Sequence, residues 1–215
     1  MRQFRHVKQT VGYQPCSMAD LNVAVAVLND GGVVAFPTET YYGLAVDPFN
    51  PLALNHLFSL KQRNIGKPIL TLVDDRKSLS SLVQDIPTLY EPLMKEFWPG
   101  PLTLVFPAKV NLPTLLTSGT STIGVRQSSH SFARQLLRAF GRPLTATSAN
   151  LSGRAAAADA YEVKSQFGSK IDIVFDGGKT PGTVGSTIIG REGKRLKLIR
   201  EGVIPFKDIL QVSQR

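Results

Sequence analysis

The sequence predicts an α/β protein in which helices flank a mixed β-sheet. Up to residue 167, short apolar runs typical of buried strands alternate with longer segments typical of helices. Beyond residue 170, three strand-like runs follow one another and are separated by glycine-rich turns. Alternation followed by a cluster of strands favours a sheet with parallel and antiparallel strands over a helical bundle or a β-sandwich.

Helices are expected where capping residues and helix stops bracket apolar segments. Ser17 and Asp20 have the spacing of a capping box, with Asp in place of the usual Glu, and the helix that follows ends at Gly31 and Gly32. Pro51 can occupy the first turn of a second helix, because its missing N–H is not needed there. This helix and the further expected ones cover 51–63, 76–83, 88–97, 129–141, 155–167 and 203–211.

Strands are expected at the apolar runs between these helices. These runs contain many of the β-branched and aliphatic residues that suit a buried sheet. They cover 33–36, 68–73, 102–108, 122–126, 143–153 (where a strand leads into a polar loop), 171–178, 185–190 and 196–200.

The 215 residues are expected to form a single domain, over 17–215, preceded by a basic N-terminal arm, over 1–16. A lone cysteine, Cys16, excludes an internal disulfide and suits a reducing compartment. No apolar run approaches the ~20 residues of a membrane span, and no apolar block follows the basic N-terminal residues as in a secretory signal. A cytoplasmic location is therefore expected.

The charge balance points to phosphate-bearing ligands. The formal net charge is +9, from 25 Lys and Arg against 16 Asp and Glu. The surplus is uneven, because segment 191–215 holds seven basic and three acidic residues. A basic surface attracts nucleotides and nucleic acids alike, so charge alone does not choose between them.

Hydroxyl-rich clusters follow three of the expected strands. They are Thr38-Glu39-Thr40, Thr147-Ser148-Ala149-Asn150 and Ser186-Thr187. In open α/β sheets, ligands bind beside the strand ends. Each cluster alone is equally explained by turn or capping chemistry, so the hypothesis of a binding site depends on their combination.

Basic residues occupy comparable positions. Lys61, Arg63 and Lys67 lie in a region broken by Gly66 and Pro68, which indicates a loop instead of a solvated helix face. Two more cations end apolar strands, at positions 126 and 200. Together with the hydroxyl clusters, these residues predict a pocket for a polyphosphate or a carboxylate.

Several common site types are excluded by their missing motifs. The chain has neither GxxxxGK[ST] nor GxGxxG, and its three histidines lack the spacing of metal ligands. No GxSxG sequence or Cys–His pair indicates a nucleophile. A pocket of hydroxyls and cations suits a reaction driven by positioning and electrostatics, such as nucleotidyl transfer.

Seven motifs occur in order along the chain and span roughly residues 17 to 205: FPTETYYGL, KQRNIGKPI, WPGPLTLVF, TIGVR, TATSANLSG, GSTII and LIREG. Together they resemble one family, the YrdC-type threonylcarbamoyl-AMP synthases (TsaC family) in their single-domain form. The resemblance implies a YrdC-like twisted open mixed sheet with flanking helices and a large basic concave cleft. It also implies condensation of L-threonine, bicarbonate and ATP to threonylcarbamoyl-AMP and pyrophosphate, as the first step of threonylcarbamoyladenosine formation next to the tRNA anticodon.

The resemblance also implies roles for individual residues. Lys61 and Arg63 would be the catalytic cations that hold the ATP phosphates. Threonine would be bound by Thr38, Arg126, Ser148 and Ser186. Further nucleotide contacts would come from Lys67, Thr122, Asn150, Ser152 and Arg200. The chain departs from the family pattern at Leu72, where a polar residue often contacts substrate.

Mg²⁺ is expected with the ATP, held mainly by phosphates and water, because its protein ligands are not evident. The implied partners are tRNA or double-stranded RNA and the proteins that transfer the threonylcarbamoyl group. The alternative from a different class is a non-catalytic RNA-binding module with the same fold, which the net charge of +9 also suits. A carbamoyl-transfer domain of the hydrogenase-maturation type is a further alternative, but its zinc-finger and acylphosphatase-like regions are missing here.

Overall fold

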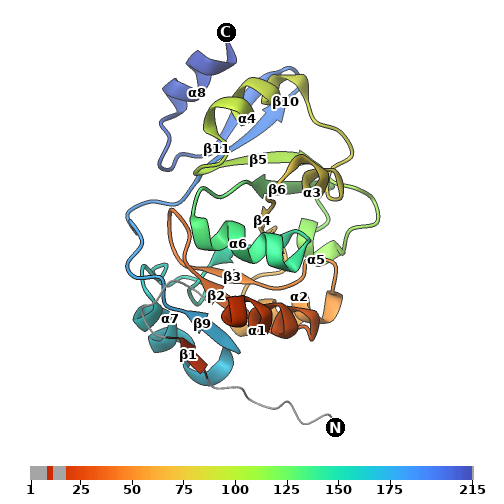
Figure 1. Cartoon of the computed structure of the whole chain (residues 1–215). Coiled ribbons are helices and arrows are strands. Elements are labelled where there is room, and N and C mark those ends of the chain that lie inside the picture. Colours follow the sequence, from red (N-terminus) through yellow and green to blue (C-terminus); the bar gives the residue numbers. More distant parts are fainter. Residues whose placement is uncertain (1–8, 12–17, 215) are drawn as a thin grey trace.

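The computed structural model describes residues 9–11 and 18–214 (Figure 1). Within these residues the strands form two hydrogen-bonded sheets. The first has the order β1 (Gln9–Val11), β9 (Ile173–Phe175), β2 (Val34–Phe36), β3 (Gly43–Ala45) and β8 (Thr147–Ser148). The second has the order β11 (Arg195–Arg200), β10 (Thr187–Glu192), β5 (Leu102–Pro107), β6 (Thr122–Arg126), β4 (Thr71–Leu72) and β7 (Leu144–Thr145).

Both sheets combine parallel and antiparallel pairs, which confirms the predicted mixed α/β class. In the first sheet, β9 pairs in parallel with both β1 and β2, whereas β3 pairs antiparallel with β2 and β8. In the second sheet, β5 pairs in parallel with β10 and antiparallel with β6. The parallel pairs bring strands far apart in the sequence together, so the sheet depends on long-range contacts.

One short segment joins the two sheets directly. The strands β7 and β8 are separated only by Ala146, so the chain passes directly from one sheet to the other. Main-chain hydrogen bonds hold this junction: Thr145 N donates to Val46 O at 3.1 Å, and Ala146 N donates to Leu70 O at 2.8 Å. The junction therefore fixes the orientation of one sheet against the other.

Helices cover the sheets on both sides. In Figure 1, α1 (Met18–Asn29) and α6 (Ser131–Phe140) lie side by side on one face, where they share an apolar core with β2 and β9. The other helices are α2 (Pro51–Lys61), α3 (Arg76–Ser80), α4 (Glu91–Phe97), α5 (Thr114–Thr117), α7 (Ala160–Phe167) and α8 (Phe206–Ser213), with 3₁₀ turns at Thr88–Tyr90 and Gly168–Lys170.

Local capping determines where α2 begins and ends. The Asn50 side chain accepts hydrogen bonds from Leu52 N and Ala53 N, and Pro51 occupies the first turn as predicted. The helix ends at Lys61, because Gln62 adopts the left-handed conformation with φ of 50°. It is thus shorter than the predicted 51–63, and the residues after Lys61 form a loop.

Two further segments can be compared with the sequence prediction. The strand β1 lies within the segment predicted to be a basic arm and extends the first sheet beside β9. The predicted boundary at residue 16 and the cysteine at that position lie outside the described residues. The helix α7 begins at Ala160 instead of residue 155, because the Asp159 carboxylate caps it by accepting from Glu162 N at 2.8 Å. None of the helices in the described ranges is long and apolar enough to span a membrane.

Candidate active site

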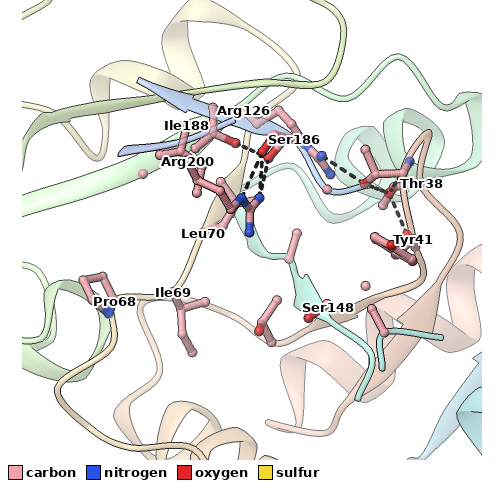
Figure 2. A pocket seen from close by; sticks show the side chains of 18 of the residues that line it. Thr38, Tyr41, Pro68, Ile69, Leu70, Arg126, Ser148, Ser186, Ile188 and Arg200 are labelled. Atoms are coloured by element: carbon pink, nitrogen blue, oxygen red, sulfur yellow. Dashed lines mark hydrogen bonds between the residues drawn. The ribbon is translucent and has the colours of Figure 1, made fainter. Parts of the chain in front are cut away.

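A cavity of about 470 Å³ is lined by residues from both sheets (Figure 2). One wall consists of the segment 38–43 together with Ser148 of β8. The opposite wall consists of β5, β6, β10 and β11, and residues 68–70 contribute to the lining as well. Seven of the predicted site residues line it: Thr38, Arg63, Thr122, Arg126, Ser148, Ser186 and Arg200.

Thr38 shapes the turn that opens this wall. Its hydroxyl donates to Tyr41 O at 2.6 Å and accepts from Thr40 N at 3.2 Å. Tyr41 and Tyr42 both line the cavity, and Tyr42 is fully buried. The Tyr42 hydroxyl donates to Gly178 O at 2.9 Å, so this ring anchors the turn to the segment after β9. The segment from Thr38 to Tyr42 therefore forms a hydrogen-bonded turn, and one side of this turn faces the cavity.

Arg126 ends β6 and is only 3% exposed. Its Nη1 donates to the Thr40 hydroxyl at 3.2 Å, and its Nε lies 3.6 Å from Glu39 Oε1. The other oxygen of Glu39 accepts a hydrogen bond from Ser128. Burial lowers the pKa of the Arg126 guanidinium, and the Glu39 carboxylate opposes this effect. A buried cation on a cavity wall is suited to hold a carboxylate or phosphate group.

Arg200 ends β11 on the same wall and is held by Ser186. Its Nη2 donates to Ser186 O at 2.7 Å, and the Ser186 hydroxyl lies 2.8 Å from the Thr103 hydroxyl. A Cβ atom at Gly185 would lie 2.9 Å from Arg200 Nη2, so a side chain at this position would displace the guanidinium. Burial lowers the pKa of Arg200. The charge of Arg200 also lowers the pKa of Arg126, because the two guanidinium groups are close enough to repel each other.

Arg63 reaches the cavity from the loop after α2. Its Nε donates to Lys67 O at 3.2 Å and its Nη2 donates to Pro68 O at 2.8 Å, so the guanidinium closes the loop around itself. Burial lowers its pKa. The Lys67 side chain is exposed and does not line the cavity. Of the predicted cations in this loop, Arg63 is therefore placed to meet a ligand.

Lys61 lies behind the cavity wall, and its side chain does not line the cavity. The residue is 1% exposed, and its Nζ donates to Ser148 O and, at 2.7 Å, to Asn150 O. Burial, followed by the charge of Arg63, lowers the pKa of Lys61 to about 7. Its contacts in this structure are with the protein backbone.

The polar loop after β8 is internally bonded. The Ser148 hydroxyl, which lines the cavity, donates to Asn150 Oδ1 at 2.5 Å. The Asn150 side-chain amide donates to Leu151 O at 2.9 Å and to Arg154 O at 2.8 Å. Asn150 and Ser152 do not line the cavity. They support the conformation of the loop that carries Ser148.

Sequence reasoning missed two hydroxyl residues of the lining, Thr103 and Thr120. The Thr120 hydroxyl lies 2.9 Å from that of Thr122, which had been predicted. The run of hydroxyl residues over 117–122 was a signal that could have identified it, whereas Thr103 lies inside a strand with no local signal. Leu72 is fully buried in the apolar core shared with α6 and does not line the cavity, whereas Leu70 does.

The described part of the chain has no group of three or more His, Cys, Asp or Glu side chains that could hold a metal ion. The cavity lining offers hydroxyl groups, backbone groups and the guanidinium groups of Arg63, Arg126 and Arg200. Such groups bind anions and stabilise negative charge that develops on a phosphate.

A family model described as "Telomere recombination" (Sua5_yciO_yrdC) matches residues 26–202. The chain belongs to this family. Among curated Sua5/YciO/YrdC relatives, the threonylcarbamoyl-AMP synthase of Vibrio cholerae is 38% identical over 185 residues, which are 85% of this chain and 97% of that protein. The threonylcarbamoyl-AMP synthase of Pyrococcus abyssi is 36% identical over 192 residues, which are 89% of this chain.

The fold also agrees with a solved Sua5 structure. Pyrococcus abyssi Sua5 complexed with L-threonine has a TM-score of 0.89 at 35% identity and covers 93% of this chain. The matched region is only 58% of that Sua5 chain, and 56% of the curated Pyrococcus abyssi protein. The chain therefore spans a little over half of these Sua5 relatives and nearly all of the Vibrio cholerae relative.

Proposed function

We propose that this chain is an L-threonylcarbamoyladenylate synthase, a nucleotidyltransferase that condenses L-threonine, bicarbonate and ATP. The observation that carries the proposal is the buried guanidinium of Arg126 on the wall of a hydroxyl-lined cavity. The relatives named threonylcarbamoyl-AMP synthase support it, because one of them is matched over 97% of its length. Pyrococcus abyssi Sua5, whose structure was solved with L-threonine, supports the choice of amino acid.

The amino acid is proposed to bind between Arg126 and the hydroxyl groups of the walls. The guanidinium of Arg126 would hold the threonine carboxylate, as a planar fork that matches two carboxylate oxygens. Ser186 and Ser148 line the cavity on opposite sides and would contact the amino acid together with Thr38. The hydroxyl of Thr38 is already bonded to Tyr41 O, so its contribution includes the shape of the turn.

The nucleotide is proposed to bind along the cavity on the Arg63 side. Arg63 would hold the phosphates, with Thr122 beside it and Arg200 facing the charge that develops at the α-phosphate. Direct nucleotide contacts of Lys67, Asn150 and Ser152 remain predictions, because these side chains lie outside the cavity lining. Mg²⁺ is proposed to enter as part of the MgATP substrate and to offset phosphate charge.

The proposed reaction has two steps. The threonine amine attacks the carbon of bicarbonate, and the N–C bond forms as water leaves, which gives N-carboxythreonine. The new carboxylate then attacks the α-phosphorus of ATP, the bond to the β-phosphate oxygen breaks, and pyrophosphate departs. The residues of the chain contribute binding, alignment and charge stabilisation, without a covalent intermediate on the protein. The product carries an activated acyl group, so a transferase must consume it, which we propose acts on a tRNA adenosine.

The test is a product assay on the purified protein. The protein is incubated with L-threonine, labelled bicarbonate and ATP, and threonylcarbamoyl-AMP and pyrophosphate are quantified, with each substrate omitted in turn. Product that requires all three substrates is the expected result. Folded protein that forms no product would overturn the proposal. RNA binding that weakens steeply with salt, combined with no threonine-dependent ATP consumption, would instead support the RNA-binding module.

A further inference from the structure

One residue outside the cavity is bonded to three alternate residues of the loop that carries Ser148. Lys61, the last residue of α2, donates from Nζ to Ser148 O and to Asn150 O at 2.7 Å. Its own carbonyl accepts a hydrogen bond from Ser152 N at 2.9 Å. The side chain and the backbone of one residue thus hold residues 148, 150 and 152 at once.

This arrangement fixes the peptide planes of the loop. Because the carbonyls of Ser148 and Asn150 both point at the Lys61 ammonium group, rotation of either peptide would remove a charge-assisted hydrogen bond. These bonds and the pairing of Ser148 with Gly43 in the first sheet hold the Ser148 side chain on the cavity side, where Figure 2 shows it at the lower wall. Within the loop, the bond from Ser148 to Asn150 Oδ1 adds a second restraint, but it links the two residues only to each other.

We propose that Lys61 is a positioning residue, which fixes segment 148–152 in the conformation that presents Ser148 to the substrates. The proposal rests on the function proposed above for the cavity. It assigns Lys61 a task different from a direct contact with ATP phosphates, since Lys61 does not line the cavity and Arg63, two residues further along, does. Lysine suits this task because its long chain carries several N–H donors to buried carbonyls.

The burial of Lys61 is compatible with this role. An ammonium group that is 1% exposed loses its hydration, and the two carbonyl acceptors replace part of it. Burial lowers the pKa of this group to about 7. The neutral amine still has two N–H donors, which is the number that the two carbonyls require, so the loop is held in either protonation state.

The first experiment measures the loop without any substrate. Amide hydrogen exchange is followed by mass spectrometry on peptides covering 148–154 in the wild type and in Lys61→Met. Exchange at least about tenfold faster in the variant is expected, because local opening no longer breaks two hydrogen bonds. The matched control is Lys95→Met, at an exposed lysine on α4, where this peptide should exchange as in the wild type. Unchanged exchange in Lys61→Met would overturn the proposal.

The second experiment separates positioning from phosphate contact. Calorimetry compares the affinities of Lys61→Met for AMP and for ATP, and a cycle combines Lys61→Met with Ser148→Ala. Similar losses for both nucleotides are expected, as is a Lys61→Met effect on the KM for threonine that largely disappears in the Ser148→Ala background. A loss confined to ATP, or effects that simply multiply, would overturn the proposal.

Two safeguards keep the outcomes distinct. If Lys61→Met does not fold, Lys61→Gln replaces it, because its shorter amide cannot reach both carbonyls. If the wild type makes no threonylcarbamoyl-AMP, the proposed function fails, while the exchange experiment still reports whether Lys61 holds the loop.

Discussion

Replacing Arg126 by methionine is expected to lower the free energy of unfolding by about 3 kcal/mol. The change leaves the Glu39 carboxylate, whose side chain is 14% exposed, without its cation. Removing one partner of a buried ion pair typically costs about 3–5 kcal/mol. Two features place the value at the low end: Glu39 keeps its hydrogen bond from Ser128, and Arg126 no longer repels Arg200.

A double-mutant cycle isolates the contribution of the pair. Glu39→Gln alone leaves the Arg126 charge buried, with its remaining bond to Thr40, and is expected to cost about 2 kcal/mol. The double variant, Arg126→Met with Glu39→Gln, buries neither charge. It should therefore lose about 2 kcal/mol less than the sum of the two single variants.

The assay is equilibrium unfolding in urea, followed by the fluorescence of the single tryptophan and by circular dichroism. Trp98 is a suitable probe because its Nε1 donates to Leu102 O in β5, next to the strand that carries Arg126. Coincident transitions by the two methods would justify a two-state analysis. Single-variant losses that add without coupling would refute the ion-pair argument.

Calorimetry on the same variants measures their affinity for threonine. An unchanged threonine affinity in Arg126→Met would refute the assignment of Arg126 to the threonine carboxylate.

Three further predictions concern pH, a buried hydroxyl and a close backbone contact. Because the pKa of Lys61 is about 7 when folded and 10.5 as its ordinary value, the unfolded chain binds more protons between these limits, so stability from this group rises with pH there. The free energy of unfolding is measured by urea titration at several pH values for the wild type and for Lys61→Met. The difference between the two proteins should rise with pH by up to about 1.4 kcal/mol per pH unit near pH 8 to about 10. A difference that does not change with pH would contradict the prediction. Thr187→Val should lower the free energy of unfolding by about 2–4 kcal/mol, since the hydroxyl donates to Ile204 O at 2.6 Å and accepts from two backbone amides. Thr187→Ser keeps the hydroxyl and should lower it by about 1 kcal/mol. Equal melting temperatures of the two variants would disprove this prediction. Gly202→Ala should weaken threonine binding at least about tenfold, as measured by calorimetry. The added Cβ would lie 2.2 Å from Gly185 O and would displace this part of the cavity wall. A variant that binds threonine with wild-type affinity would refute this prediction.

Strong local signals made most elements predictable. Pro51 indicated the first turn of α2, and an amphipathic segment that ends at a glycine indicated α6, so both helices were predicted within a few residues. The end of α2 was predicted less well, because the left-handed residue there is Gln62, which gives no glycine signal. The three-residue strands β1 and β3 are too short to show a period, and their pairing depends on strands distant in the sequence.

The candidate site was predictable in composition but not in geometry. Hydroxyl residues and cations identified seven residues of the lining, among which Thr38, Arg126 and Ser186 do meet at one cavity. Thr103 was missed because only the pairing of β5 with β10 brings it to Ser186. The support of Arg126 by Glu39 joins residues 87 positions apart (126 − 39), so no local pattern could predict it. Lys61 and Arg63 belong to one motif, but Arg63 lines the cavity whereas the buried Lys61 lies behind its wall.

The pairing of β5 with β10 also has a consequence for the order of events during synthesis. Leu102 and Leu104 in β5 are fully buried in the finished protein, and their parallel neighbour β10 begins only at Thr187. While the ribosome is still making the intervening residues, this edge of β5 is unpaired and available for wrong association. The cavity wall at residues 185–200 is likewise the last wall to be translated. The cavity therefore lacks this wall until residues 185–200 have been translated.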